Sequence, residues 1–197
     1  IAGLYLDCDK FYAGLFVALK NANIKNITIT ESDISSSNTG GSISAFAGYI
    51  GGAVNYSKCI ITDSVNISGA HASGYASYGS GNVTIDSCGS FANITGSKYT
   101  ASFIADVWSS TLKISNSIGI EKFSPRRSIT STNNYSTVAD TYGTNIVTTD
   151  KMTGIAAKEN MSKLNWQRVW ATNEDGYPVI KVITSDSNPG EVWSGRV

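Results

Sequence analysis

The sequence predicts an all-β protein whose short strands stack as a solenoid of about four to five coils, followed by a small C-terminal α/β cap. Strand-like segments recur along the first 120 residues with a period of roughly 24–32 residues, which is the sequence signature of a repeat architecture. The expected surface consists of small hydroxyl and amide residues rather than charges, and helical spacing is confined to the C-terminal part. Together these observations favour a solenoid, in which each coil contacts only its neighbours.

The composition excludes several functional classes. Ser, Thr and Asn make up close to a third of the 197 residues, and charged residues make up 15%, against roughly 25% in typical soluble domains. Lys+Arg and Asp+Glu are 15 each, so the Lys/Arg surplus that nucleic-acid binding requires is missing. The 41% hydrophobic content excludes disorder, and no run approaches the roughly 18 apolar residues of a membrane span.

The first repeated element is a short alternating strand that ends in small polar residues. Four segments share this pattern: 27–32, 59–64, 83–88 and 112–117. The alternation places apolar side chains inside and polar side chains outside. We therefore expect these segments to be equivalent strands of successive coils.

Two further elements complete each repeat. Segments 65–69 and 92–96 form the second, and segments 13–17, 47–51, 73–77 and 101–105 form the third. The third element carries aromatic side chains that we expect to stack on one another as a ladder along the solenoid: Phe16, Tyr49, Tyr75 and Phe103. We favour packing in the core or at a corner for these rings over a role as a ligand platform. Three short strands per period fit one coil of a parallel β-helix. A β-sandwich is the competing architecture, but the mutual resemblance of the copies favours the solenoid.

Charge distribution divides the chain. Only four formal charges fall between residues 34 and 105, whereas charged residues become frequent from residue 121. We expect β-helix repeats over 1–122, a connecting segment over 123–149, a cap over 150–183 and a tail or linker over 184–197. The chain opens on a strand-like run without methionine or signal peptide, which suggests a piece of a longer parent chain with further modules.

The cap is expected to combine a helix over 154–164 with a strand over 177–180. A solenoid end exposes strand edges that invite aggregation, so we expect the cap to cover such an end. Trp166 and Trp170 supply apolar area for this packing, and a carbohydrate platform is the alternative role for them.

Residues that could carry chemistry are scarce. His71 is the only histidine and has no carboxylate nearby in sequence, so a surface polar role is expected. The carboxylates of the repeats fall at different ladder positions in this alignment, which disfavours the clustered acids of a polysaccharide-cleaving site: Glu31, Asp33, Asp63 and Asp86.

The three cysteines lack metal-ligand spacing. The alignment does not place Cys59 and Cys88 in one column, so these two are expected to be buried free thiols. No cofactor or metal is expected.

The repeats resemble a known family. The third element, with its small–small–aromatic or aliphatic–aliphatic–small pattern, resembles a degenerate GLUG motif, which repeats in bacterial surface proteins including the immunoglobulin-A-specific metallopeptidases. Segments 1–7, 11–16 and 23–29 resemble the first module of such proteins, and 152–180 resembles the segment that closes their arrays. The resemblance implies a right-handed parallel β-helix on or secreted from a bacterial cell. The family's peptidase activity lies in a separate domain, and one histidine cannot supply a His-Glu-x-x-His motif.

We therefore expect a non-catalytic extracellular or cell-surface module that acts as a stalk or as an adhesion surface. Its partners would be glycans or host or neighbouring surface proteins, with neither nucleic-acid binding nor membrane insertion. The expected ligand surface comprises Tyr49, Tyr75, Trp166 and Trp170. The alternatives are a polysaccharide-acting enzyme of the pectin-lyase-like β-helix type and a self-assembling structural fibre.

Overall fold

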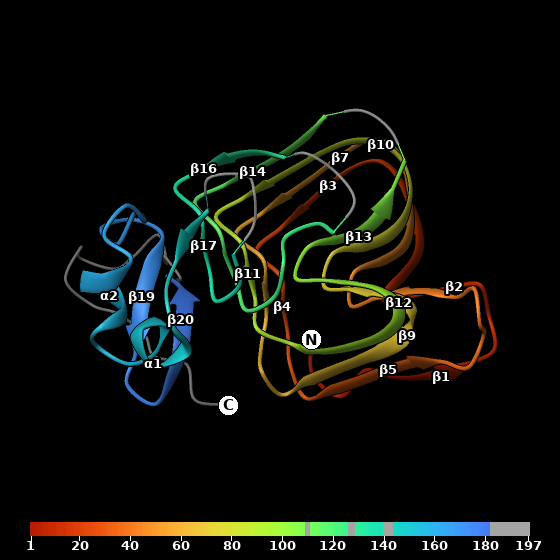
Figure 1. The fold of residues 1–197 in the computed structure, drawn as a ribbon, viewed down its shortest axis with the longest axis horizontal. Helices are drawn as coiled ribbons and strands as arrows, with labels where there is room; N and C mark the ends of the chain where they lie inside the picture. The colour runs from red at the N-terminus through yellow and green to blue at the C-terminus, as the bar shows by residue number, and fades with distance from the viewer. Residues whose placement is uncertain (109–110, 126–128, 140–143, 182–197) are drawn as a thin grey trace, which may run out of the picture.

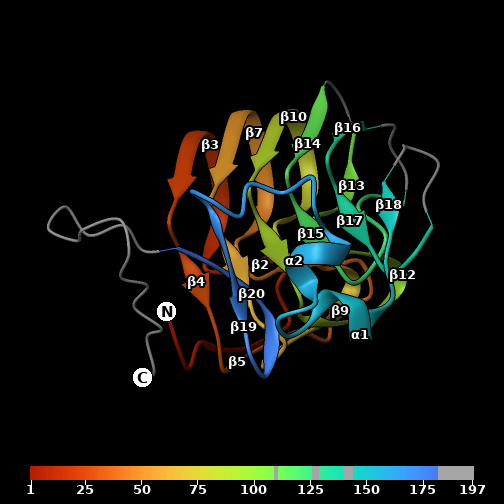
Figure 2. The same cartoon turned by 90° about the vertical axis from the view of Figure 1, so that its left-hand side faces the viewer.

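The computed structural model describes residues 1–108, 111–125, 129–139 and 144–181. It confirms the predicted fold class, because parallel strands wind into a β-solenoid of about 4 turns (Figure 1). The strands of successive coils lie side by side when the molecule is turned, as β3, β7, β10 and β14 show in Figure 2.

Three parallel sheets form the sides of the solenoid. The first sheet contains β1 (Tyr5–Cys8), β2 (Tyr12–Ala13), β5 (Ser32–Ser36), β6 (Ser42–Ser44), β9 (Val65–Ser73) and β12 (Asn93–Ala101). The second contains β3 (Phe16–Lys25), β7 (Ala47–Ser57), β10 (Ala76–Asp86), β13 (Ile104–Val107), β14 (Leu112–Ser115) and β16 (Thr130–Thr132). The third contains β4 (Thr28–Ile29), β8 (Ile60–Ile61), β11 (Gly89–Ser90), β15 (Ile118–Gly119), β17 (Tyr135–Ser136) and β18 (Asn145–Ile146).

Apolar columns along the coil axis form the core. Val54 pairs with Val83, and Val83 pairs with Leu112 on the next coil, and all three side chains are buried. Outward-facing polar residues form ladders as well, for example in the first sheet. One such ladder joins Asp33 to Asn66 at 2.7 Å and continues to Asn93 at 3.3 Å.

The corner between the second and third sheets repeats one backbone conformation. In each coil the residue that follows the strand of the second sheet is left-handed, with φ between 52° and 56°: Asn26, Lys58, Ser87, Asn116 and Asn133. Among non-glycine residues, Asn tolerates this region best because its side chain can hydrogen-bond locally. The abundance of Asn therefore has a structural cause at this corner.

The residues directly after that corner form an internal hydrogen-bond ladder. The backbone N–H of Cys59 donates to Cys88 Sγ at 3.5 Å, that of Cys88 to Ser117 Oγ at 3.1 Å, and that of Ser117 to Asn134 Oδ1 at 3.0 Å. Cys59 and Cys88 are buried free thiols, as expected, but their expected separation into different columns is wrong.

The repeat alignment is correct in part. Segments 83–88 and 112–117 lie in register in the second sheet, and segments 27–32 and 59–64 lie in register where β4 meets β8 in the third. The four segments therefore belong to two columns and not to one.

The expected ladder of aromatic rings is present, but some of its residues differ from the expected ones. Tyr75 stacks between Phe46 at 4.9 Å and Phe103 at 5.1 Å between ring centroids, and Phe103 meets Phe123 at 4.7 Å. Tyr49 pairs instead with Tyr78 and Phe16 pairs with Ala47, so their expected places in this ladder are wrong.

The C-terminal part packs against the outer face of the third sheet. It comprises α1 (Thr149–Met152), α2 (Ala157–Asn160) and the antiparallel hairpin of β19 (Trp170–Asn173) and β20 (Gly176–Ile180). Its apolar cluster joins Met152, Met161 and Trp170 to Ile118 and Tyr135 of the sheet. Figure 1 shows these elements beside β11 and β17, so the prediction that they cover an end of the solenoid is wrong.

The expected connecting segment contains strands. β16, β17 and β18 lie within residues 123–149 and extend the second and third sheets. The expected tail, 184–197, lies outside the described residues.

Candidate functional site

An aromatic cluster lies outside the solenoid core, where the far end of the first sheet meets the start of the second. We call it the tyrosine seam and define it as Phe11, Tyr12, Tyr49, His71, Tyr78, Tyr99 and Asp106. One row belongs to the first sheet, in which Tyr12, Ser42, His71 and Tyr99 follow one another in register. The other row belongs to the second sheet, in which Tyr49, Tyr78 and Asp106 follow one another.

Small residues bring the two rows together. A Cβ atom on Gly48 would lie 2.6 Å from the backbone nitrogen of Ala13 and 3.0 Å from the carbonyl oxygen of Ser42, so only glycine allows the second sheet to approach this closely. One coil further, the hydroxyls of Ser73 and Ser77 lie 3.0 Å apart across the bend. The local richness in Gly and Ser thus positions the aromatic rings.

Three tyrosines pack together at the centre of the seam. The ring centroid of Tyr12 lies 5.3 Å from that of Tyr49 and 5.9 Å from that of Tyr78, and the last two lie 6.3 Å apart. Burial raises the pKa of Tyr12, and the neighbouring Tyr78 and Tyr49 phenols add to the shift. Tyr12 therefore stays neutral at physiological pH, and the three side chains offer both ring surface and hydroxyl groups.

The rim of this cluster is open to solvent. Phe11 is 47% exposed and packs edge-on against Tyr12 and Tyr78. The three tyrosines are each partly exposed. Such a combination of rigid aromatic surface and polar tips is typical of binding sites.

His71 lies beside the tyrosines and is paired with a carboxylate. Its Nδ1 atom is 3.5 Å from Asp106 Oδ2, with side-chain exposures of 11% and 3%, and its ring is 5.3 Å from that of Tyr99. The expectation of a surface histidine without an acidic neighbour is wrong, because the carboxylate arrives from the next coil.

A hydroxyl lies in register with this pair, but it lacks the geometry of a catalytic nucleophile. Ser42 is the neighbour of His71 on the preceding coil, and its buried Oγ makes no hydrogen bond to any described residue. A nucleophilic serine is activated by a hydrogen bond to its base. In this structure the Ser42 hydroxyl is not held against His71 in that way.

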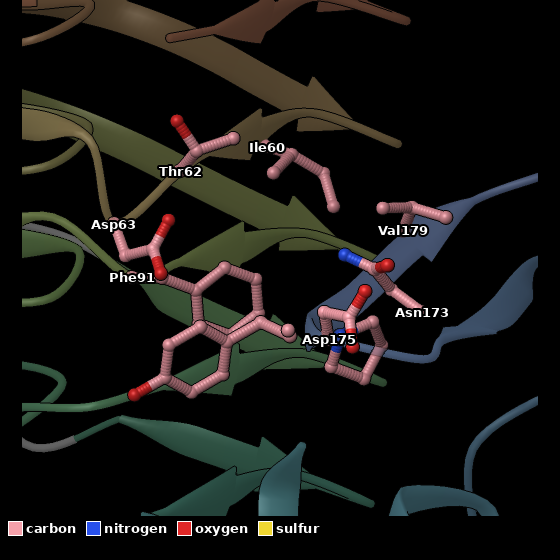
Figure 3. Close-up of a pocket in the computed structure, with 10 residues that line it drawn as sticks. Ile60, Thr62, Asp63, Phe91, Asn173, Asp175 and Val179 are labelled. Carbon is pink, nitrogen blue, oxygen red and sulfur yellow. The ribbon is translucent and has the colours of Figure 1, made fainter. Parts of the chain in front are cut away.

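A pocket lies between the third sheet and the C-terminal hairpin (Figure 3). It has a volume of about 150 Å³. Phe91 and Tyr177 stack in its wall with centroids 4.3 Å apart, and burial raises the pKa of Tyr177. Asp63 and Asp175 lie at its rim. Among the described residues, no group of three or more His, Cys, Asp or Glu side chains could hold a metal ion.

The four residues of the expected ligand surface lie in different parts of the structure and differ in exposure. Tyr49 lies in the tyrosine seam and is partly exposed. Tyr75 and Trp170 are fully buried, so neither ring can face a ligand. Trp166 is half-buried and donates its indole N–H to Met161 O at 2.8 Å, which gives it a role within the C-terminal part.

Sequence reasoning missed the other members of the seam. Tyr78 carried a usable signal, because it follows Tyr49 by one coil and alternation places both outward. Tyr12 and Asp106 carried no comparable signal, since their proximity to this surface depends on the bend between the two sheets.

Comparison of the chain with protein-family models, curated proteins and solved structures finds no match. Of the helices within the described ranges, none is long and apolar enough to cross a membrane.

Proposed function

We propose that this chain is a non-catalytic extracellular module that binds neutral glycans through the tyrosine seam. The observation that carries the proposal is the partly exposed cluster of Tyr12, Tyr49 and Tyr78 with Phe11 at its rim. Apolar C–H faces of sugar rings stack on aromatic rings, and their hydroxyls pair with phenol groups and other polar side chains.

Charge supports a neutral ligand over an anionic one. The seam contains no Lys or Arg, and its one carboxylate, Asp106, is paired with His71. The chain as a whole has no net charge, so attraction to an acidic polymer has no source in the sequence.

The wider setting of this proposal is a bacterial surface protein. The similarity of the repeats to GLUG motifs supports this origin, and a cell-surface or secreted location follows from it. The solenoid then serves as a rigid stalk whose seam provides an adhesive face.

The direct test is binding of the purified chain to a panel of neutral and acidic polysaccharides. Replacing Tyr49 or Tyr78 by alanine is expected to weaken binding to the neutral polysaccharides by about tenfold or more, or roughly 1.4 kcal/mol. Tyr5→Ala is the matched control, because Tyr5 is 73% exposed and lies on β1, away from the seam.

Two outcomes would contradict the proposal. Equal loss of binding in Tyr5→Ala would place the ligand elsewhere, and binding to acidic polymers alone would remove the argument from charge. Release of new reducing ends from a bound polysaccharide would favour the enzymatic alternative, with His71 and Asp106 as the first residues to replace.

A further inference from the structure

Cys59 and Cys88 occupy the same position in consecutive coils. The residues that follow them, Ile60 and Gly89, are paired partners in the third sheet. Neighbouring strands are about 4.8 Å apart, which falls within the Cα separation of roughly 4.4–6.8 Å that a disulfide spans. Backbone geometry therefore permits a covalent link between these coils.

The side chains are also directed toward one another. Cys88 Sγ lies 3.5 Å from the backbone nitrogen of Cys59, and the two thiols are close enough that each shifts the pKa of the other. The sulfur atoms also contact backbone carbonyls, which are Ser57 O at 3.4 Å and Ile24 O at 3.7 Å for Cys59, and Asp86 O at 3.3 Å for Cys88.

We propose that Cys59 and Cys88 are a covalent modification site, at which a low-molecular-weight disulfide such as oxidised glutathione links the two coils during folding. One cysteine thiolate attacks the small disulfide, which forms a mixed disulfide and expels one thiolate. The second cysteine then attacks the protein sulfur of that mixed disulfide and expels the other. Two protein thiols are oxidised, one small disulfide is reduced to two thiols, and the cysteine protons pass to the leaving thiolates.

The reaction belongs to the folding chain because the folded one shields both sulfur atoms. Both cysteines are 0% exposed, so a small disulfide cannot reach either sulfur in the completed solenoid, and burial also raises the pKa of the Cys88 thiol well above its ordinary value. Exchange can occur while the coil that begins at β9 is still open. The finished disulfide would then close a loop along one complete coil and resist reduction.

The test is to unfold the reduced chain and refold it with a mixture of oxidised and reduced glutathione. Residues 59–97 contain no Lys or Arg, so trypsin, which cuts after Lys58 and Lys98, releases both cysteines in one fragment, which is expected to be lighter by two hydrogen atoms. A second digestion with chymotrypsin, which cuts after Tyr75 and Tyr78, should leave the two halves joined until a reductant is added.

Variants separate this pair from unspecific oxidation. Cys8→Ser is expected to keep the linked fragment, whereas Cys88→Ser should lose it and still fold, because Ser117 fills the same position in the next coil. The oxidised wild type is expected to melt about 5–10 °C above the reduced protein, with no such difference in Cys88→Ser.

The proposal is overturned if the refolded wild type carries only free thiols or glutathione adducts at Cys59 and Cys88. It is equally overturned if Cys8 is linked to either residue in preference to the pair.

Discussion

The hydroxyl of Tyr75 ties two coils together from inside the core, and its removal should measurably weaken the solenoid. The hydroxyl oxygen lies 2.7 Å from Cys59 O and 2.9 Å from Gly89 O, carbonyls of consecutive coils. The neighbours in the same column, Phe46 and Phe103, already lack a hydroxyl, so Tyr75→Phe keeps the ring packing. The substitution removes the hydroxyl from both carbonyls, but Cys59 O still accepts the N–H of Gly89 at 2.9 Å, so the cost is that of one buried hydrogen bond, about 0.5–1.5 kcal/mol.

Urea unfolding, followed both by circular dichroism and by tryptophan fluorescence, measures this cost. Coincident transitions justify a two-state analysis. A loss of about 1 kcal/mol lowers Tm by roughly 2–4 °C in a chain of this size. Tyr5→Phe is the control, because its exposed ring should change stability by less than about 0.5 kcal/mol. If Tyr75→Phe also stays within that limit, the hydroxyl does not bridge the coils as described.

Three further predictions test other parts of the molecule. Lys58→Asn should raise Tm slightly, because Lys58 has φ +53° at a corner where three equivalent residues are Asn, and a lower Tm would contradict the shared corner geometry. Burial raises the pKa of Glu121, so the folded chain binds this proton more tightly and loses stability as pH rises through that pKa. Glu121→Gln should therefore raise Tm at pH 7 but not near pH 4, and a pH-independent difference would contradict it. Burial also raises the pKa values of Tyr56 and Tyr75, so stability should fall above about pH 10. These two phenols should ionise only when the chain unfolds. If the tyrosinate absorbance shows that all tyrosines ionise before the circular dichroism signal is lost, their burial would be refuted.

Sequence patterns were sufficient for the fold class because a solenoid repeats its local physics. Alternation in segments 83–88 and 112–117 identified strands that do lie in register. The Asn-rich corners found in the structure have the same repeated cause, since a left-handed residue is needed there once per coil. Neither feature depends on contacts between residues whose separation along the chain differs from the repeat.

The register of the third element could not be obtained from residue similarity. Gly48-Tyr49 and Gly74-Tyr75 look alike in sequence, yet Tyr49 faces outward and Tyr75 faces the core. The two glycines are required by different close approaches, Gly48 by the backbone of Ala13 and Gly74 by the carbonyl of Ser102. Both positions therefore need glycine because another part of the backbone lies close by, and not because they are equivalent positions of the repeat.

The candidate site was predicted only through Tyr49, and the reason is geometric. The seam forms where the chain bends back between two sheets, and a periodic pattern describes strands but not the angle between them. The same limit applies to His71 and Asp106, which are brought together from consecutive coils. The placement of the C-terminal part on a side of the solenoid likewise depends on Ile118 and Tyr135 forming an apolar outer face.

Chemical-shift mapping of the isotope-labelled chain with fragments of a neutral polysaccharide tests the central claim most directly. If the tyrosine seam binds glycans, the largest shifts will cluster at Tyr12, Tyr49 and Tyr78 and at the adjoining Ser42 on the next coil. Shifts confined to the hairpin pocket around Tyr177, or none at saturating fragment concentration, would contradict it.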